Sequence, residues 1–493
     1  MAGPRVAVMG AGWSGLAAAA QLQDGGAHVT LFDTSRTAGG RARSLAATTD
    51  DLQGDLRLDC GQHILTGACT QTLALMQRVG VRLDEALLRI PLTLRHASGQ
   101  GGSAPDGPLA RTLLRALPPG SDMALALALW RGWTLAERLA LLRRLATWQR
   151  GGFALEADVP VARLCAGLPP AVVRDFIAPL ALSALNTPLA SASGRIFLHV
   201  LATTLRPDAA VPCGWRGSDL LLPRQPLDDL LPAPALQHLS RHGATLRLGE
   251  RVTALLPTAS PHVGWRLQTS KTLQSAEEVF DHVLLATPLR ASATLLRELA
   301  PDWANAAQAV PHQPIITLYL RRTDASARAP LPWPAPLLAL RDSANLADGR
   351  PAQFALDLQA LHGQPLIALV VSAAAPWLMW MRSKGRDALA ALLRHQLMAQ
   401  AGHTFAPDVQ RAPQQHLPVA ALLCERRATP ECRVGLRRPP AQVATAHGVL
   451  HLAGDALDSP WPGTLEGAVR SGQAAARATL DDLARLRPVR AGR

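Results

Sequence analysis

The sequence has few aromatic residues and almost no lysine. Aromatic residues make up 4% of its 493 residues, and Tyr319 is the single tyrosine. Lys271 and Lys384 are the only lysines, so arginine carries nearly all the positive charge behind the formal net charge of +13. The arginines are scattered and form no basic run interleaved with aromatic residues, so we expect no nucleic-acid partner. The core must be built mainly from leucine, alanine and valine.

The chain also lacks the cysteine patterns of metal and disulfide sites. Its six cysteines include no C-x-x-C pair and no Cys/His cluster with zinc spacing, so we predict no metal site. Reduced thiols then favour a cytoplasmic protein. No apolar run of about eighteen residues or more is present, which argues against a membrane-spanning helix. The first residues already have the pattern of a strand, so we expect no cleaved signal peptide.

The chain begins with the elements of a dinucleotide-binding unit. The apolar pattern predicts a strand over 6–9, a helix over 16–22 and a second strand over 28–33. Three glycines with G-x-G-x-x-G spacing separate the first strand from the helix: Gly10, Gly12 and Gly15. Such glycines allow a tight turn, let a pyrophosphate approach bare backbone, and let helix and strand pack closely. The helix N-terminus, with Trp13 and Ser14, offers free N–H groups to the phosphates.

An acidic residue, Asp33, ends the second strand eighteen positions after Gly15. Its carboxylate is placed to bind ribose hydroxyls, and its charge would repel a 2′-phosphate. A glycine-rich turn of an ordinary α/β unit is the alternative interpretation. Because strand, glycines, helix, strand and acid all occur in order, we predict a dinucleotide site.

A second glycine-rich loop follows, with Gly39 and Gly40 before Arg41 and Ser44. It could close over a pyrophosphate, with Arg41 neutralising the charge. With this loop the sequence resembles the flavin-dependent amine oxidase and phytoene desaturase superfamily, which couples G-x-G-x-x-G…Asp/Glu to a G-G-R-x-x-S loop. The resemblance implies FAD, rather than NAD, as the cofactor.

A further landmark of that superfamily matches the segment from Leu58 to His63. The resemblance implies a strand and turn that pass beside the isoalloxazine ring, with Gly61, Gln62 and His63 facing the flavin or the substrate. A structural hydrogen bond that holds the turn is the alternative role for His63. By the same resemblance, Val252 binds adenine through its backbone.

The C-terminal motif resembles the second flavin motif of the superfamily. A strand is predicted over 448–452, and a helix begins at about Leu465. The resemblance implies that Asp455 binds the ribityl chain or the pyrophosphate and that the helix N-terminus stabilises the negative charge of reduced flavin. The motif contributes six expected cofactor-binding residues: Gly454, Asp455, Gly463, Glu466, Gly467 and Ala468.

The expected fold is α/β, with a Rossmann-like FAD-binding domain around a parallel sheet. Residues 1–85, 215–290 and 416–493 are assigned to that domain. Residues 86–214 and 291–415 are assigned to a split, largely helical α+β substrate domain.

Two apolar segments of the substrate domain have two interpretations. A helix over 130–148, with apolar residues at Leu135, Leu139, Leu142 and Leu145, is expected to cover a core. A helix resting on a bilayer is the alternative. The run 377–381, rich in Trp and Met, is expected in the core, with an apolar pocket or lipid contact as alternatives.

The substrate class follows from a departure from the superfamily pattern. Its amine oxidases hold the amine between aromatic side chains, and Thr464 stands where one of them is expected. A pocket rich in leucine and alanine instead fits an isoprenoid hydrocarbon. Segments 58–67, 183–188 and 222–227 resemble the squalene-associated FAD-dependent desaturase group. That resemblance implies reductive removal of the allylic hydroxyl of hydroxysqualene, giving squalene for hopanoid synthesis.

This chemistry requires a general acid and a hydride held close to the substrate. His63 is the first candidate for the acid, and Asp59 is the second, because it is expected to serve the turn. A carotenoid-type (phytoene) desaturase or isomerase, a flavin amine oxidase and a non-catalytic FAD-binding scaffold are the alternatives. An unidentified electron donor must reduce FAD, and a hydrocarbon substrate implies peripheral contact with the inner face of the membrane.

Overall fold

The opening strand, β1 (Arg5–Met9), lies inside a six-stranded sheet of order β10-β2-β1-β14-β21-β20. The computed structural model describes residues 3–46, 57–258, 264–271 and 278–486. All neighbours in this sheet run parallel except the edge strand β20, which is antiparallel to β21. The remaining strands are β2 (His28–Asp33), β10 (Thr245–Leu248), β14 (His282–Leu285), β20 (Gln442–Thr445) and β21 (Gly448–Leu452). The Rossmann-like sheet is confirmed.

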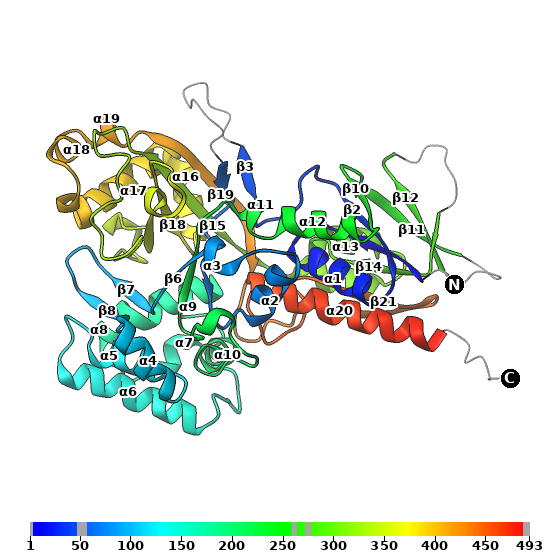
Figure 1. The fold of residues 1–493 in the computed structure, drawn as a ribbon, viewed down its shortest axis with the longest axis horizontal. Coiled ribbons are helices and arrows are strands. Elements are labelled where there is room, and N and C mark those ends of the chain that lie inside the picture. The colour runs from blue at the N-terminus through cyan, green and yellow to red at the C-terminus, as the bar shows by residue number, and fades with distance from the viewer. Residues whose placement is uncertain (1–2, 47–56, 259–263, 272–277, 487–493) are drawn as a thin grey trace.

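Strand β1 is buried on both faces, which explains its unbroken apolar sequence. Alternate side chains point to opposite faces of a sheet. Val6 and Val8 therefore lie in the core under α1 (Trp13–Asp24) and α20 (Leu465–Leu486), whereas Met9 lies in the core on the other face. Figure 1 shows α1 and α20 side by side, although they come from opposite ends of the chain.

The opposite face of the sheet is covered by α13 (Leu289–Leu295) and α14 (Pro301–Ala309). Trp303 of α14 is buried in the same cluster as Met9. These helices belong to the cofactor domain by packing, whereas residues 291–415 are predicted to belong to the substrate domain. The difference arises because an amphipathic helix does not reveal in its sequence which sheet it covers.

A small antiparallel sheet extends the cofactor domain. It contains β11 (Val252–Thr258), β12 (Gly264–Thr269) and β13 (Val279–Phe280). The segments 245–248 and 252–258 do not pair with each other, although they are adjacent in the sequence. The first is β10, which pairs in parallel with β2, and Gly249, with φ of +69°, turns the chain away before β11 begins.

The substrate half has a sheet of its own, of order β16-β17-β18-β15-β19. Its core side chains alternate, so that Leu318 and Leu320 of β15 face the helices α16 and α17, whereas Tyr319 faces Leu58 and Leu222. Figure 1 places this sheet and its helices above a cluster of helices that includes α4, α5, α6 and α10. The elements are β15 (His312–Arg321), β16 (Leu337–Ala339), β17 (Phe354–Asp357), β18 (Leu366–Val371), β19 (Val419–Pro430), α15 (Leu358–His362), α16 (Ala375–Lys384), α17 (Arg386–Ala401), α18 (Pro407–Arg411) and α19 (Pro413–His416).

Strand β19 lies in a different domain from the one predicted for it. Residues 416–493 are predicted to belong to the FAD-binding domain, but β19 pairs along β15 in the sheet of the substrate half. Its last residue, Pro430, reaches the C-terminal motif, where a Cβ on Gly463 would lie 2.6 Å from the Cδ of Pro430. The strand therefore joins the two halves.

The helical cluster of the substrate half differs from the predicted helix in two respects. The helix expected over 130–148 is α6 (Leu135–Arg150), which begins after a capping box formed by Thr134 and Glu137. Leu141 and Trp148 are buried, whereas Leu135 and Leu139 of the expected core stripe are exposed. A wide π turn, Val173–Ile177, precedes α9 (Ala178–Leu185), where Pro179 has no N–H to donate.

The remaining elements are short strands and helices that connect these layers. They are β3 (Ser44–Ala46), β4 (Arg57–Asp59), β5 (Leu65–Thr66), β6 (Leu87–Ile90), β7 (Thr93–Arg95), β8 (Gly101–Ser103), β9 (Leu220–Pro223), α2 (Thr70–Arg78), α3 (Leu83–Ala86), α4 (Pro108–Ala116), α5 (Ser121–Ala128), α7 (Val161–Leu164), α8 (Pro170–Val172), α10 (Gly194–Leu205), α11 (Leu227–Leu230) and α12 (Pro232–Arg241). Among the described helices, none is both long enough and apolar enough to cross a membrane.

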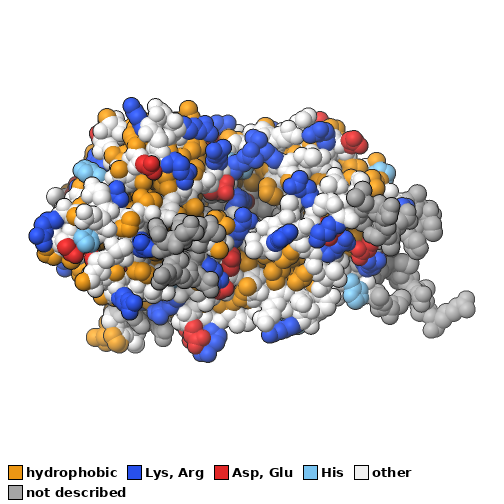
Figure 2. All heavy atoms as spheres, turned by 90° about the horizontal axis from the view of Figure 1, so that it is seen from above, with side chains coloured by type: hydrophobic (Ala, Val, Ile, Leu, Met, Phe, Trp, Pro, Cys, Tyr) orange, Lys and Arg blue, Asp and Glu red, His pale blue; other side chains and the backbone are white. Residues whose placement is uncertain are grey.

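The surface agrees with the scattered arginines of the sequence. On the face drawn in Figure 2, Lys and Arg side chains occupy many separate places and form no continuous stripe.

The segment 377–381 lies in α16, where Trp377 and Met381 are buried and Met379 is exposed. Its core interpretation is therefore confirmed for the two buried residues.

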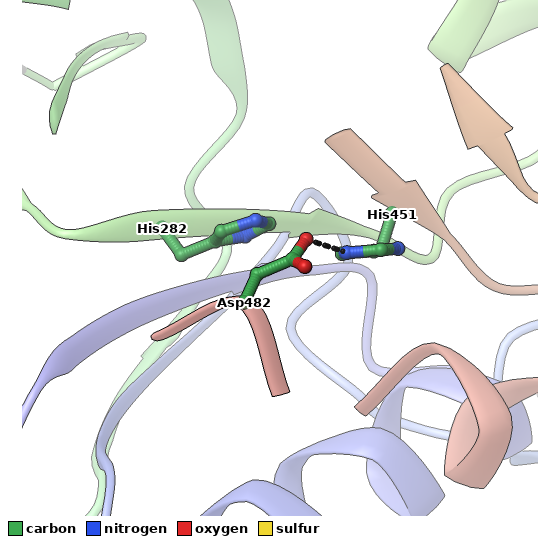
Figure 3. Close-up of side chains that lie close together, drawn as sticks. All are labelled: His282, His451 and Asp482. Carbon is green, nitrogen blue, oxygen red and sulfur yellow. Dashed lines mark hydrogen bonds and ion pairs between the residues drawn. The ribbon is translucent and has the colours of Figure 1, made fainter. Parts of the chain in front are cut away.

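A histidine pair fastens α20 to the sheet (Figure 3). The rings of His282 in β14 and His451 in β21 stack with centroids 5.3 Å apart. His451 Nε2 donates a hydrogen bond to Asp482 of α20 at 2.8 Å. In the described part of the chain, these three side chains form the one Cys/His/Asp/Glu group whose geometry could hold a metal ion. The prediction of no metal site stays a prediction.

We predict that His282 makes the protein sensitive to acid. Burial, and then the neighbouring His451, lowers the pKa of His282 to about 4. Between this value and the unfolded value of about 6.5, only the unfolded chain takes up the proton, so stability falls as the pH falls through that window. From pH 7 to pH 5 the expected loss from His282 is about 2 kcal/mol.

Urea unfolding at pH 7 and pH 5 measures this loss, with His282→Gln as the comparison. The other titrating groups are common to both proteins and cancel in the difference. An equal loss in wild type and His282→Gln would show that His282 titrates normally in the folded protein.

Candidate cofactor and active site

The first glycine loop is built by close backbone contacts. Gly10 adopts φ of +107°, a region that favours glycine, and its N–H donates to the Phe32 carbonyl at 2.7 Å. A Cβ on Gly10 would lie 2.4 Å from the Ala286 oxygen, and a Cβ on Gly15 would lie 1.8 Å from the Gly10 oxygen. Two of the three glycines are therefore required by the crossing of β1, β14 and α1.

Gly12 has a different role, because no protein atom crowds it. A Cβ there would meet only the Cα of Gly40, at 3.9 Å. Gly12 is also the N-cap of α1, and no side chain accepts a hydrogen bond at this helix end. Two bare backbones, at Gly12 and Gly40, thus face each other across the start of α1. This is the cradle that a pyrophosphate needs, so the residues present fit a dinucleotide such as FAD.

The helix start and second glycine loop are held together locally. Gly39 donates its N–H to the Ala11 carbonyl at 2.8 Å, and the indole of Trp13 donates to the Ala42 carbonyl at 3.0 Å. Ser14 is buried beside the crossing of α1 and α20. Trp13 therefore positions the cradle with its side chain, and both residues can offer backbone N–H groups to a phosphate.

Asp33 lies at the C-terminal end of β2, as expected for a ribose-binding acid. Its carboxylate accepts from the N–H of Ala11 and from the N–H of Ser35, both at 2.6 Å. Each oxygen keeps a second lone pair for a ribose hydroxyl. The Asp33 carbonyl accepts from Glu250 at 2.8 Å, which brings the start of β11, and with it Val252, to this end of the site.

Arg41 and Asp455 form an ion pair that joins the two ends of the chain. The Arg41 guanidinium also donates to the Ala428 carbonyl of β19 at 2.5 Å. The Asp455 side chain is 9% exposed, and its coulombic attraction and hydrogen bond raise the pKa of Arg41 against the lowering effect of burial. The two residues predicted to contact the pyrophosphate or ribityl chain are therefore brought together, but they also neutralise each other.

The start of α20 is confirmed at Leu465, and its N-cap is Thr464. The Thr464 hydroxyl accepts from the N–H of Gly467 at 3.1 Å, and its carbonyl accepts from Ala468 at 2.9 Å. A Cβ on Gly467 would lie 2.7 Å from the Pro462 oxygen. Gly454 donates its N–H to Ser471 in the same helix at 3.0 Å. These contacts fix the strand-to-helix turn that aims α20.

The carboxylate of Glu466 is used by the protein itself. It is 2% exposed and accepts from the N–H groups of Gln71 and Thr72 at 3.1 and 2.9 Å. It also accepts from the Thr72 hydroxyl at 2.6 Å and from Arg470 at 2.7 Å. Glu466 therefore caps α2 and fastens it to α20. The geometry gives its side chain this positioning role, and its contact with the cofactor stays a prediction.

The turn after β4 is anchored by the single tyrosine. The fully buried Tyr319 donates its hydroxyl proton to the Asp59 carbonyl at 2.8 Å and accepts from the Gln62 amide at 2.8 Å. The Asp59 carboxylate accepts from Ser44 at 2.7 Å and from the Leu227 N–H at 3.1 Å, and burial raises its pKa to about 6. Asp59 thus serves the turn.

His63 lies next along this turn and is half-buried. A Cβ on Gly61 would lie 3.7 Å from its Nε2. Burial, and then the positive charge of Arg41, lowers the pKa of His63 to about 4. Its ring is therefore neutral at pH 7 in this structure. No hydrogen bond to that ring is found among the described residues, so the alternative structural role receives no support.

Two contributors to the site were not predicted from the sequence. Tyr319 lies far from every motif and carried no local signal. Gly472 lets α20 cross α1, because a Cβ there would lie 2.0 Å from the Ser14 oxygen. Gly472 could have been noticed because it lies two turns into the last helix. A glycine there lowers helix stability by about 1 kcal/mol relative to alanine, which indicates that close packing requires it.

Comparison with known proteins agrees with this geometry. The pattern described as flavin containing amine oxidoreductase matches residues 13–480. The chain belongs to the flavin-containing amine oxidoreductase family. It is therefore an FAD-dependent oxidoreductase. That FAD lies in the cradle between Gly12 and Gly40 stays a prediction.

Individual relatives cover nearly the whole chain. Hydroxysqualene dehydroxylase of Rhodopseudomonas palustris is 27% identical over 96% of this chain and 98% of its own length. The enzyme of the same name from Sinorhizobium fredii is 26% identical over 97% of this chain and 98% of its own.

Solved structures support the fold. An oxidoreductase from Methanosarcina mazei aligns with a TM-score of 0.65 at 14% identity, covering 96% of this chain and all of that one. A redesigned putrescine oxidase aligns with a TM-score of 0.60 at 14% identity, covering 98% of this chain and 99% of that one.

We predict that Gly12→Val removes FAD binding without unfolding the protein. The branched side chain has room beside the protein but fills the place of the pyrophosphate, so affinity should fall by roughly a hundredfold. Gly107→Val is the matched control, because Gly107 is also a helix N-cap with φ of −68° and no neighbour within 4 Å of an added Cβ. FAD titration followed by flavin fluorescence measures both variants. Equal affinities in the two variants would contradict the cradle.

Proposed function

We propose that this protein removes the allylic hydroxyl of hydroxysqualene reductively, giving squalene for hopanoid synthesis. The observation that carries the proposal is the full-length similarity to relatives named hydroxysqualene dehydroxylase. The geometry around Thr464 supports it, because a hydroxyl that caps α20 stands where an amine oxidase is expected to place an aromatic ring. In this proposal the substrate is an isoprenoid alcohol and not an amine.

The balance of the reaction is simple. The C–O bond of the alcohol breaks, one proton leaves with the oxygen as water, and a hydride replaces the hydroxyl on carbon. Bound FAD in its reduced form supplies that hydride and ends oxidised. The chain must therefore hold the cofactor, exclude water from the reacting carbon and deliver one proton to the departing oxygen.

We propose His63 as the proton donor. It lies on the turn that the family resemblance places beside the isoalloxazine ring. With a pKa of about 4, the protonated ring gives up its proton more readily than an ordinary imidazolium does. The negative charge of a bound pyrophosphate would offset the positive charge of Arg41 and raise that pKa. Asp59 is the weaker candidate, because its Oδ1 already accepts two hydrogen bonds from the protein.

The low solubility of the substrate in water also determines where the enzyme must meet it. Both the alcohol and squalene dissolve in a bilayer and not in water. We therefore propose peripheral contact with the inner face of the membrane, where an electron donor, still to be identified, reduces FAD between turnovers.

Anaerobic incubation tests the proposed reaction. Enzyme with reduced FAD is mixed with hydroxysqualene, and flavin absorbance and extracted lipids are followed. We expect flavin oxidation and squalene in equal amounts. Reduced flavin that persists beside unchanged alcohol would overturn the proposal. Oxidised enzyme with phytoene is the parallel trial, and its bleaching would favour a carotenoid-type desaturase.

A pH profile tests the role of His63. Because only the protonated ring can donate, we expect kcat to rise as the pH falls, with a slope near −1 in log kcat above the pKa. His63→Gln should lose this slope and lower kcat by roughly a hundredfold to ten-thousandfold while it retains FAD. His403→Gln, at an exposed histidine of the substrate half, is the control. The same profile in wild type and His63→Gln would exclude His63 as the acid.

A further inference from the structure

The exposed apolar side chains are concentrated in one segment. Eleven large apolar residues are exposed in the described part of the chain, and seven of them fall between 109 and 139. They are Leu109, Leu113, Leu117, Leu125, Leu129, Leu135 and Leu139. Scattered single leucines are ordinary on a protein surface, but this concentration in one short segment is not. We name these seven residues the leucine surface.

The spacing within each helix shows why these side chains are exposed. Leucines four residues apart lie on one face of a helix. Leu109 and Leu113 form such a pair in α4, and Leu135 and Leu139 form one in α6. Leu125 lies in α5, and Leu117 and Leu129 are the C-cap residues of α4 and α5. The opposite faces are partnered, since Leu114, Leu127 and Leu141 are buried. Each helix is therefore apolar on two sides, one toward the core and one toward solvent. Leu109 and Leu135 are the most exposed, at 73% and 69%.

The three helices are held together as one corner of the molecule. Figure 1 shows α4, α5 and α6 gathered at the lower left, remote from the N-terminus. Arg138 of α6 donates to the Ala128 carbonyl of α5 at 3.0 Å. Arg216 donates to the Leu114 carbonyl of α4 at 2.7 Å, and also pairs with the buried Asp122 of α5 at 3.4 Å. These polar contacts position the helices without covering their leucines.

The charge of this corner is positive. Residues 107–150 contain seven arginines, no lysine and two acids, Asp122 and Glu137. Asp122 is buried, and Glu137 closes the capping box of α6. On the exposed face of α6, the leucines at 135 and 139 are followed at helical spacing by Arg143 and Arg150, both exposed. An apolar face bordered by arginines matches the acyl chains and anionic headgroups of a bilayer.

We propose that the leucine surface docks on the anionic leaflet of a phospholipid membrane, with the leucines in the acyl boundary and the exposed arginines at the phosphates. A second copy of the chain fits less well, because a two-fold interface would place arginines against arginines. The inference rests on the proposed function in one respect, namely that the substrate is carried in lipid. The surface itself is argued from burial and charge alone.

Vesicle co-sedimentation tests the docking with the FAD-loaded protein. We expect binding to vesicles of phosphatidylcholine with phosphatidylglycerol, and at least tenfold weaker binding to phosphatidylcholine alone. The double variant Leu113→Ser/Leu135→Ser should lose at least tenfold in affinity for the anionic vesicles. Leu256→Ser, at an exposed leucine of β11 in the cofactor domain, is the matched control and should bind as wild type does.

Three results would overturn the proposal: no binding of wild type to anionic vesicles, equal loss in the control, or a dimer in light scattering that the double variant converts to a monomer. An activity assay with detergent-dispersed substrate separates this inference from the proposed reaction. Vesicle binding without dehydroxylation would leave the surface intact and reject the reaction. If the double variant still converts detergent-dispersed substrate but no longer converts substrate held in vesicles, both the docking surface and the proposed reaction are supported.

Discussion

The structure depends on the close crossing of α1 and α20. A side chain at Gly472 would overlap the backbone of Ser14, so the first and last helices meet with no side chain between them. This crossing places the starts of both helices at one end of the six-stranded sheet. Arg41 and Asp455, which follow β2 and β21, can therefore pair directly. A site assembled from residues more than four hundred positions apart in the sequence is thus held by backbone contact.

The two ends of the chain were predictable because their signals are local. The strand over 28–33 and the helix beginning at Leu465 agree with the structure residue for residue. In each motif, spacing along the chain determines spacing in the fold. The middle was not predictable in the same way. Strand β19 and the helices α13 and α14 have ordinary patterns, and their domain is decided by partners distant in sequence. Leu135 and Leu139 fit a core stripe but lie in solvent.

The roles of single residues were likewise predictable where they depend on local structure and not where they depend on distant contacts. Gly12 and Asp33 lie where the sequence places them, because their chemistry is that of the backbone turn in which they occur. Glu466 was assigned to the cofactor from its motif, yet its oxygens bind α2. The sequence contains no pattern that predicts the four protein groups that donate hydrogen bonds to the Glu466 carboxylate. The low pKa of His63 is likewise a property of burial beside Arg41, and both causes exist only in the folded chain.

Tyr319 gives the site a built-in probe. It is the single tyrosine among 493 residues, and its hydroxyl lies between the Asp59 carbonyl and the amide of Gln62. Uniform incorporation of fluorotyrosine would therefore label one position, on the turn that leads to His63, without any engineered change. A single fluorine resonance would then report changes on this turn when cofactor and substrate bind.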